Sequence, residues 1–406
     1  MSPRELRASL SLAAIFGLRL FGMFVVLPVF ALWAEGRPGW NLTLVGVALG
    51  VYGLTQAALQ IPFGYWSDRK GRKPVLYAGL AIMAAGSFVA AASDSPWLVI
   101  LGRMLQGAGA ISAVAIAMAG DLTRESQRTK AMAIIGSTIG AAFALSFVAA
   151  PFLEHAIGLR GLFAMTGVLC ILAMGVVAWI VPDVVGPPPA REAGSMRRLL
   201  RDAELIRLNA GIFTLRMVLM AVFVVVPKAL VDAGQPPASH WWVYLASVGG
   251  GFVLMLPTVM RSSARESIVV LGAIAGIAVA LAALLASLGN FAGLLAALVI
   301  FFTAFNVLEA KLPALVSRAA PRGARGVATG IFSSVQFLGM FAGGAAGGVL
   351  AQHGGPVAVI AACLVATVAW LALASRMGEF APISLADEAQ GLAAAEGGAA
   401  APRTSS

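Results

Sequence analysis

Long apolar stretches separated by short polar segments run along almost the whole chain. A helix of about 20 apolar residues is long enough to cross the hydrocarbon layer of a membrane. Stretches of roughly this length lie at residues 9–34, 42–65, 75–93, 96–120, 131–152, 161–182, 206–230, 239–260, 267–287, 291–315, 325–351 and 356–375. The pattern therefore predicts an all-α membrane protein with 12 transmembrane helices.

Some of these boundaries depend on turn-forming residues rather than on charges. Residues 267–308 contain no charged side chain, and the Ser-Leu-Gly-Asn cluster at 287–290 predicts a turn that divides them. The His-Gly-Gly-Pro sequence at 353–356 separates the last two spans in the same way. In the first span, Gly22 and Pro28 are expected to bend the helix.

The composition agrees with a membrane protein. Of the 406 residues, 60% are hydrophobic and 11% are charged, whereas soluble domains contain about 25% charged residues. Cys170 and Cys363 both lie in apolar stretches, so neither a disulfide framework nor a metal site is expected. The sequence has no G-x-x-x-x-G-K-[ST] phosphate loop and no pattern of catalytic residues. We expect a protein that is not an enzyme, has no cofactor and does not use ATP.

Arginine and lysine are distributed unevenly between the connections. Most of the 28 cationic residues lie in the two terminal segments or in the connections 66–74, 121–130, 183–205, 261–266 and 316–324. The alternate connections contain only Arg37 and Arg160. By the positive-inside rule, the cation-rich connections and both termini face the cytoplasm. The same bias explains the net charge of +10 without a nucleic-acid partner.

The longest internal connection divides the spans six and six. It covers residues 183–205 and contains three consecutive prolines followed by a basic run. Two equal halves joined by a polar linker are typical of the internal repeats of secondary transporters. We predict an N-terminal six-helix bundle at 1–182, a cytoplasmic linker at 183–205, a C-terminal six-helix bundle at 206–376, and a disordered cytoplasmic tail at 377–406.

The connection between the second and third spans has an unusual pattern. Residues 64–74 read Gly-Tyr-Trp-Ser-Asp-Arg-Lys-Gly-Arg-Lys-Pro, which fits G-x-x-x-D-R-x-G-R-K. The residues of this pattern are Gly64, Asp68, Arg69, Gly71, Arg72 and Lys73. A cytoplasmic anchor would explain the cations, but it would explain neither the acid nor the spacing of the glycines.

Several charged residues lie well inside the spans: Arg19, Arg103, Arg216 and Glu309. A charge at the centre of a membrane costs about 2.5–3.5 kcal/mol on insertion scales, so such residues need partners or water. Glu309 is the only acid placed deep in an apolar span, and Arg216 is its plausible partner. Glu309 could carry a proton or could form a structural salt bridge. Lys311 lies on another face of the same helix and is expected to snorkel towards the cytoplasm.

Other polar and small residues are candidates for a transport cavity or for close helix packing. Arg103 and Gln106 share a helix face, and Gly107 beside them allows close packing. Gly136 and Gly140 have the spacing of a packing motif, although this pattern is common in membrane helices. The candidate cavity residues are Arg19, Gln56, Gln60, Phe143, Asn306 and Gln336. Most aromatic side chains are expected to face lipid or the interface rather than a ligand.

The chain resembles the major facilitator superfamily, in particular its twelve-span drug:proton antiporters. The resemblance is carried by residues 64–74 (the loop motif called A), by 103–110 (motif B), and by Gly22 and Pro28. It implies two six-helix bundles around a central cavity that work by alternating access. It also implies a gating latch, in which Asp68 meets the start of the eleventh span at 326–329 and Asp121 pairs with Arg72.

Two features depart from the family pattern. The corresponding loop in the second half, 260–267, contains Arg261, Arg265 and Glu266 but lacks the glycine-aspartate pattern, so the latch is expected on one side only. In the fifth span, Pro151 follows two alanines and is not part of a Gly-Pro pair, which weakens the case for antiport.

The residues and the resemblance together predict a secondary transporter in a bacterial inner membrane. We expect proton-coupled export of small amphipathic or drug-like molecules, driven by the proton gradient. The expected partners are a small-molecule substrate, protons and the lipid bilayer, and the protein is expected to be monomeric. The alternatives are a proton symporter or facilitator that imports a nutrient, and, in a different class, a membrane receptor that does not transport.

Overall fold

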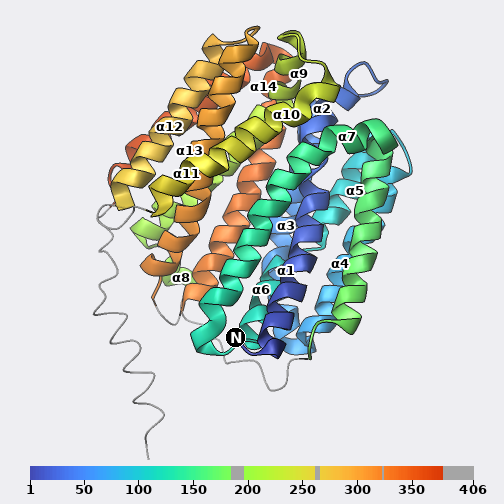
Figure 1. Cartoon of the computed structure of the whole chain (residues 1–406), viewed down its shortest axis with the longest axis vertical. Helices are drawn as coiled ribbons and strands as arrows, with labels where there is room; N and C mark the ends of the chain where they lie inside the picture. Colours follow the sequence, from blue (N-terminus) through green and yellow to red (C-terminus); the bar gives the residue numbers. More distant parts are fainter. Residues whose placement is uncertain (184–195, 261–265, 322–323, 378–406) are drawn as a thin grey trace, which may run out of the picture.

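The computed structural model describes residues 1–183, 196–260, 266–321 and 324–377, and within these ranges the regular structure is helical. Most helices run roughly parallel to the long axis of the molecule, with the N-terminus at the lower end in Figure 1. The predicted all-α class is confirmed. Most of the predicted linker and nearly all of the predicted tail lie outside the described residues, and the division into two bundles stays a prediction.

The N-terminal half contains seven helices. They are α1 (Pro3–Phe24), α2 (Leu27–Ala34), α3 (Leu42–Lys70), α4 (Arg72–Ala91), α5 (Pro96–Ala108), α6 (Ser112–Asp121) and α7 (Glu125–Trp179). The described part of the C-terminal half contains α8 (Met196–Leu199), α9 (Ala203–Asp232), η1 (Pro237–Ser239), α10 (His240–Tyr244), η2 (Leu245–Gly249), α11 (Gly250–Met260), α12 (Glu266–Ala286), α13 (Phe291–Ala319) and α14 (Arg325–Ala374).

Ten helical segments of the described chain are long and apolar enough to cross a membrane. Two of these segments are parts of α7 and α14, which contain 55 and 50 residues and are each long enough for two crossings. Each contains a glycine with non-helical backbone angles, Gly158 in α7 and Gly355 in α14. Figure 1 shows α7 reversing its direction at the upper end of the molecule. The helices are therefore consistent with 12 crossings, counted as ten segments of which two cross twice.

The first crossing is broken, as Gly22 and Pro28 predicted. α1 ends at Phe24 and α2 begins at Leu27, with Pro28 in its first turn. Proline is tolerated there because the first helical N–H groups have no partner within the helix. The fourth crossing is also broken, between Ala108 and Ser112, which the apolar pattern did not predict.

The predicted connection at 66–74 is almost entirely helical. α3 continues to Lys70 and α4 begins at Arg72, so Gly71 is the single residue between the two helices. Its backbone angles are φ 90° and ψ 157°, a region that is essentially restricted to glycine. The connection is tight because the charged residues at the membrane surface extend both helices beyond the apolar spans. α8 likewise places one helical turn within the predicted linker.

Glycines bring α3 and α14 into close contact across the two halves. A Cβ atom on Gly46 would lie 2.1 Å from the carbonyl oxygen of Gly344, and one on Gly53 would lie 2.4 Å from that of Phe337. The packing role expected for Gly136 and Gly140 was wrong, because a Cβ atom at either position would meet no heavy atom within 4 Å. Glycine spacing alone does not reveal which glycines lie against another backbone.

Candidate transport site

The two charged residues singled out in the second half form an ion pair. Arg216 in α9 donates a hydrogen bond from Nη2 to Oε1 of Glu309 in α13. The Arg216 side chain is 8% exposed, whereas that of Glu309 is 30% exposed. Glu309 lies 10 residues before the end of α13, which corresponds to about 15 Å along the helix. The pairing predicted from the sequence is therefore confirmed, although its role in proton coupling stays a prediction.

Three buried polar atoms around this pair have no hydrogen-bond partner. They are Nε of Arg216, Oε2 of Glu309 and Nδ2 of Asn306. Asn306 precedes Glu309 by three residues, so both side chains lie on one face of α13. Buried polar groups are normally satisfied by protein or water. The free donors and acceptor give this site the capacity to bind water or a polar group of a substrate.

Lys311 was expected to reach the solvent, but its side chain is buried. It is 9% exposed, and its Nζ lies 3.9 Å from a carboxylate oxygen of Glu266 in α12. Arg318 pairs with the same carboxylate at 2.9 Å. Lys311 therefore extends towards a carboxylate near the helix end that is predicted to be cytoplasmic, rather than into open solvent.

A buried polar network in the first half surrounds Arg19. Its guanidinium donates hydrogen bonds to Ser112 Oγ at 2.6 Å, to Tyr52 Oη at 2.6 Å and to Gln56 Oε1 at 2.5 Å. Gln56 donates in turn to Gln60 Oε1 at 3.1 Å. The structure thus brings together three predicted cavity residues and adds Tyr52 and Ser112, which the sequence analysis did not identify as site residues.

The contacts described for Arg19 are all with neutral acceptors. The side chain is 2% exposed and lies within the membrane span, so its charge is not balanced by a carboxylate among its described partners. A buried charge without a counter-ion is costly, which makes Arg19 a candidate for contact with an anionic or strongly polar group.

The motif B residues connect helices rather than line the space between the two halves. Arg103 donates to the carbonyl oxygen of Ala48 in α3 at 3.2 Å and to Gln106 Oε1 at 2.9 Å. Gln106 donates to Ser87 in α4 at 2.8 Å. Gly107 lies so close to α3 that a Cβ atom would be 2.1 Å from the carbonyl oxygen of Tyr52. The shared face of Arg103 and Gln106 is therefore confirmed, but it is turned towards α3 and α4.

A cluster of aromatic rings joins the two halves next to the ion pair. It consists of Phe24, Phe143, Phe147, Phe223, Tyr244, Phe301, Phe302 and Phe305, which we call the aromatic cluster. Phe143 stacks on Phe305 with 5.9 Å between ring centroids. The Arg216 guanidinium lies over the same Phe305 ring, 5.7 Å from its centroid. Phe143 is thus buried between the halves, and the general expectation of lipid-facing aromatics was wrong for this cluster.

The last predicted cavity residue, Gln336, is half-buried in α14.

The motif A residues form a compact charged cluster at the junction of α3 and α4. Arg72 donates from Nη1 to Asp68 at 2.5 Å and from Nε to Asp121 at 2.7 Å. It also donates to Ser67 Oγ at 2.7 Å. The pairing of Arg72 with Asp121 is confirmed. The contact of Asp68 with the start of α14 stays a prediction.

The remaining motif A residues lie around this cluster. The Nζ atom of Lys73 lies 2.7 Å from a carboxylate oxygen of Asp183, and the Arg69 guanidinium lies over the Tyr65 ring at 4.3 Å. Gly64 lies in the last third of α3, where an added Cβ atom would be 4.0 Å from Cβ of Ala113.

Polar contacts also connect the two halves at the end opposite the motif A cluster. Lys228 in α9 pairs with Glu35 at the end of α2, at 3.0 Å. The backbone N–H of Leu42 donates to Oε1 of Gln352 in α14 at 2.9 Å. The sequence analysis missed these outer contacts because residues at the ends of distant spans give no local signal of their pairing.

Both the sequence and the fold define a known class of transporter. The model of the Major Facilitator Superfamily matches residues 12–344. The chain belongs to the Major Facilitator Superfamily of membrane transporters. This membership confirms the predicted resemblance and the expectation that the chain is a transporter rather than an enzyme.

Two curated relatives and one solved structure illustrate the similarity. The inner membrane transport protein YajR of Escherichia coli (strain K12) is 42% identical over 386 residues, which cover 93% of this chain and 85% of YajR. The multidrug resistance protein MdtH of Yersinia enterocolitica is 27% identical over 255 residues, which cover 61% of this chain and 62% of MdtH. A bacterial homologue of the lysosomal transporter Spinster has a similar fold, with a TM-score of 0.75 at 14% identity, covering 94% of this chain and 100% of that structure.

Proposed function

We propose that this transporter exports small amphipathic or drug-like molecules in exchange for protons. The observation that carries the proposal is the pair of Arg216 and Glu309, with one carboxylate oxygen of Glu309 unpaired and the side chain partly exposed. The MdtH relative is a multidrug resistance protein, which supports a drug-like substrate here. YajR is an inner membrane protein, which supports the same location here, with both termini in the cytoplasm.

The geometry supports competition between a proton and a substrate at Glu309. A protonated carboxyl group is neutral, so protonation weakens its attraction for Arg216. A substrate with a cationic or hydrogen-bonding group would favour the ionised form and would displace the proton. If only one of the two can occupy the site at a time, each exchange moves them in opposite directions. The aromatic cluster next to the pair offers apolar surface for the rest of the molecule. No cofactor is required for this cycle.

The motif A cluster is proposed to couple this site to the rocking of the two halves. Asp68 and Asp121 both hold Arg72, which ties the junction of α3 and α4 to the end of α6. A carboxylate near the N-terminus of a helix gains about 0.3–1 kcal/mol from the helix dipole. Asp68 would make this contact with α14 in one state of the transporter and lose it in the other.

Transport into proteoliposomes under an imposed pH gradient tests the exchange. The internal pH is measured with a dye while cationic, neutral and anionic compounds are added one at a time. We expect compound-dependent proton flux in the direction opposite to compound movement. For Glu309→Gln we expect proton flux at the level of empty liposomes, because the amide cannot release a proton at neutral pH.

Two further variants make the result specific to Glu309. Glu204→Gln removes another carboxylate that pairs with an arginine of α9, Arg207, and should leave coupling intact. Arg216→Gln combined with Glu309→Gln removes both charges, so a folding defect caused by an unpaired Arg216 should be relieved while coupling stays absent. Full proton coupling in the Glu309→Gln protein would disprove the assignment.

The alternative is import by symport or facilitation. The incomplete antiporter motif around Pro151 favours this alternative. Proton and compound movement in the same direction would establish symport, and compound movement without proton flux would establish a facilitator.

A further inference from the structure

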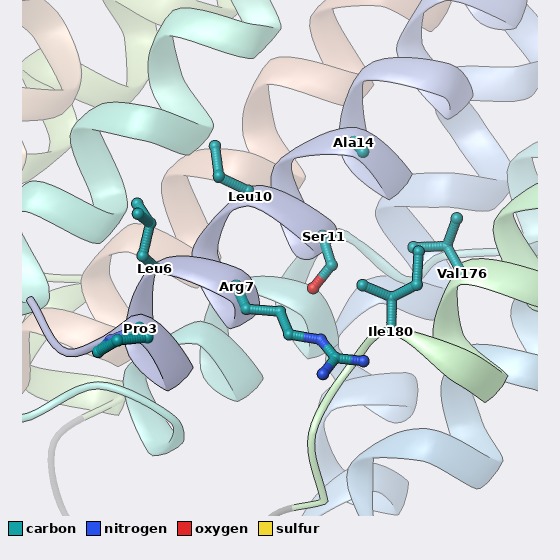
Figure 2. Close-up of a pocket in the computed structure, with 8 residues that line it drawn as sticks. All are labelled: Pro3, Leu6, Arg7, Leu10, Ser11, Ala14, Val176 and Ile180. Carbon is teal, nitrogen blue, oxygen red and sulfur yellow. The ribbon is translucent and has the colours of Figure 1, made fainter.

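A groove on the outside of the N-terminal half lies between the start of α1 and the end of α7. It has a volume of about 520 Å³ and is lined by Pro3, Leu6, Arg7, Leu10, Ser11, Ala14, Val176 and Ile180. Figure 2 shows Val176 and Ile180 across from α1, with the Arg7 guanidinium at one end of the groove. This groove is separate from the ion pair and from the Arg19 network.

The walls of the groove are apolar and face away from the core. Leu10 is 53% exposed, Leu6 is 44% exposed and Ile180 is 41% exposed. Because these side chains belong to segments that cross the membrane, their natural neighbours are acyl chains. Ala14 is the α1 residue of the groove farthest from the N-terminus, so the apolar part of the groove runs along α1 from the predicted membrane surface inwards.

Cationic groups gather at the end of the groove that is predicted to be cytoplasmic. Arg7 donates from Nη2 to the carbonyl oxygen of Trp179 at 2.9 Å, and Arg4 donates to the carbonyl oxygen of Asp183 at 3.3 Å. Arg4, Arg7 and Lys73 line a second hollow next to the groove. In it, Nζ of Lys73 lies 2.7 Å from a carboxylate oxygen of Asp183. Three cations against one carboxylate leave an excess of positive charge, and both guanidinium groups keep N–H groups that can bind an anion.

We propose that this groove binds an anionic phospholipid of the cytoplasmic leaflet. The phosphate group lies at Arg7 and Arg4, and one acyl chain lies along Leu6, Leu10 and Val176. Basic groups at the cytoplasmic membrane surface attract anionic lipids by about 1 kcal/mol for each Lys or Arg, which corresponds to about a fivefold change in affinity. Trp179 is 81% exposed beside the cations and belongs at the level of the headgroups.

Fluorescence quenching by brominated lipids tests the proposal in bilayers. The protein is reconstituted in mixtures of phosphatidylglycerol and phosphatidylcholine, with bromine on the acyl chains of one lipid or the other. The signal of Trp179 is the difference between the unchanged protein and Trp179→Phe, since the chain contains 8 tryptophans. We expect stronger quenching of Trp179 by brominated phosphatidylglycerol than its share of the bilayer predicts.

Variants distinguish a built site from general attraction to the membrane. Arg7→Gln should weaken the enrichment about fivefold, whereas Arg7→Lys should retain most of it. Arg128→Gln is the matched control, because Arg128 is also exposed and donates to a backbone carbonyl, that of Gly120, at 3.3 Å. Ala14→Phe should reduce the enrichment by filling the groove while all charges remain.

Three results would overturn the proposal. Equal quenching by the two brominated lipids would show that the groove does not select anionic lipid. An equal loss in Arg7→Gln and Arg128→Gln would show general surface attraction. Displacement of the lipid by soluble glycerol phosphate would show a site for a free phosphate anion rather than for a lipid.

Discussion

The buried arginines of this transporter differ in the charge of their partners. Arg72 and Arg216 each contact carboxylates, whereas the contacts described for Arg19 and Arg103 are with neutral groups. An ion pair would lose much of its attraction if its carboxylate took up a proton, whereas a neutral partner carries no charge to lose. Arg19 and Arg103 have no acid among these contacts. The pair of Arg216 and Glu309 is therefore better suited to the proposed proton coupling than the Arg19 network.

The backbone conformation at position 71 requires a glycine. Gly71→Ala places a side chain in a region of φ and ψ that glycine alone adopts freely, so we expect a loss of about 1–3 kcal/mol of folding free energy. Thermal unfolding in detergent measures this loss. Gly272→Ala is the control, because Gly272 lies inside α12 with no heavy atom within 4 Å of an added Cβ. Equal stability of the two variants would contradict the role of Gly71.

The paired helices α3 and α14 show how closely two elements from different halves can approach. Gly46 and Gly344 permit this contact, which involves the first turns of α3 and the first of the two crossings in α14. The sequence predicted both helices from their apolar length, but the contact between them depends on glycines that are far apart along the chain. The Arg19 network shows the same limit, since the stripe of Gln56 and Gln60 was visible in the sequence and its partner Ser112 was not.

Gly46→Ala is expected to weaken the closure of the outer side. Its Cβ would lie 2.1 Å from a backbone oxygen of α14, and overpacking of this kind costs about 1–3 kcal/mol. Helices that can separate relieve the clash, so the population should shift towards outward opening. The readout is the labelling rate of Val29→Cys by an impermeant maleimide, because Val29 is buried at the start of α2, the second part of the first crossing.

The control for this substitution is Gly140→Ala, which meets no heavy atom within 4 Å. Both variants are made without the native cysteines Cys170 and Cys363, which are buried. Equal labelling of Val29→Cys in the two backgrounds would contradict the proposed role of the glycine contact.

Viewed as a whole, the molecule has its two halves joined by several kinds of contact. Glycines bring the backbones of α3 and α14 together, the aromatic cluster packs rings from both halves, and Lys228 pairs with Glu35. We expect these contacts to close the side that is predicted to be outer. Hydropathy predicted 12 crossings, with which the helices are consistent. It could not predict these contacts, because they depend on the relative placement of two halves that are far apart along the chain.

The ion pair of Lys228 and Glu35 should contribute modestly to this closure. Exposed pairs contribute about 0.2–1 kcal/mol, so Glu35→Gln should raise the labelling of Val29→Cys by up to about fivefold. High salt should produce a similar rise in the unchanged protein. Asp94→Asn is the control, because Asp94 pairs with Arg37 within one half at 3.8 Å. A similar rise in that variant would show that the effect is not specific to the contact between halves.

The two glycines that interrupt α7 and α14 occupy corresponding places in the two halves. Gly158 has φ 66° and ψ 173°, and Gly355 has φ 64° and ψ −166°, so the backbone turns in nearly the same way at both places. Each glycine lies between the last two crossings of its half. Two halves built as internal repeats would place the same turn at the same point of each half. The two glycines are therefore corresponding positions at which a residue with a side chain would be strained in both halves.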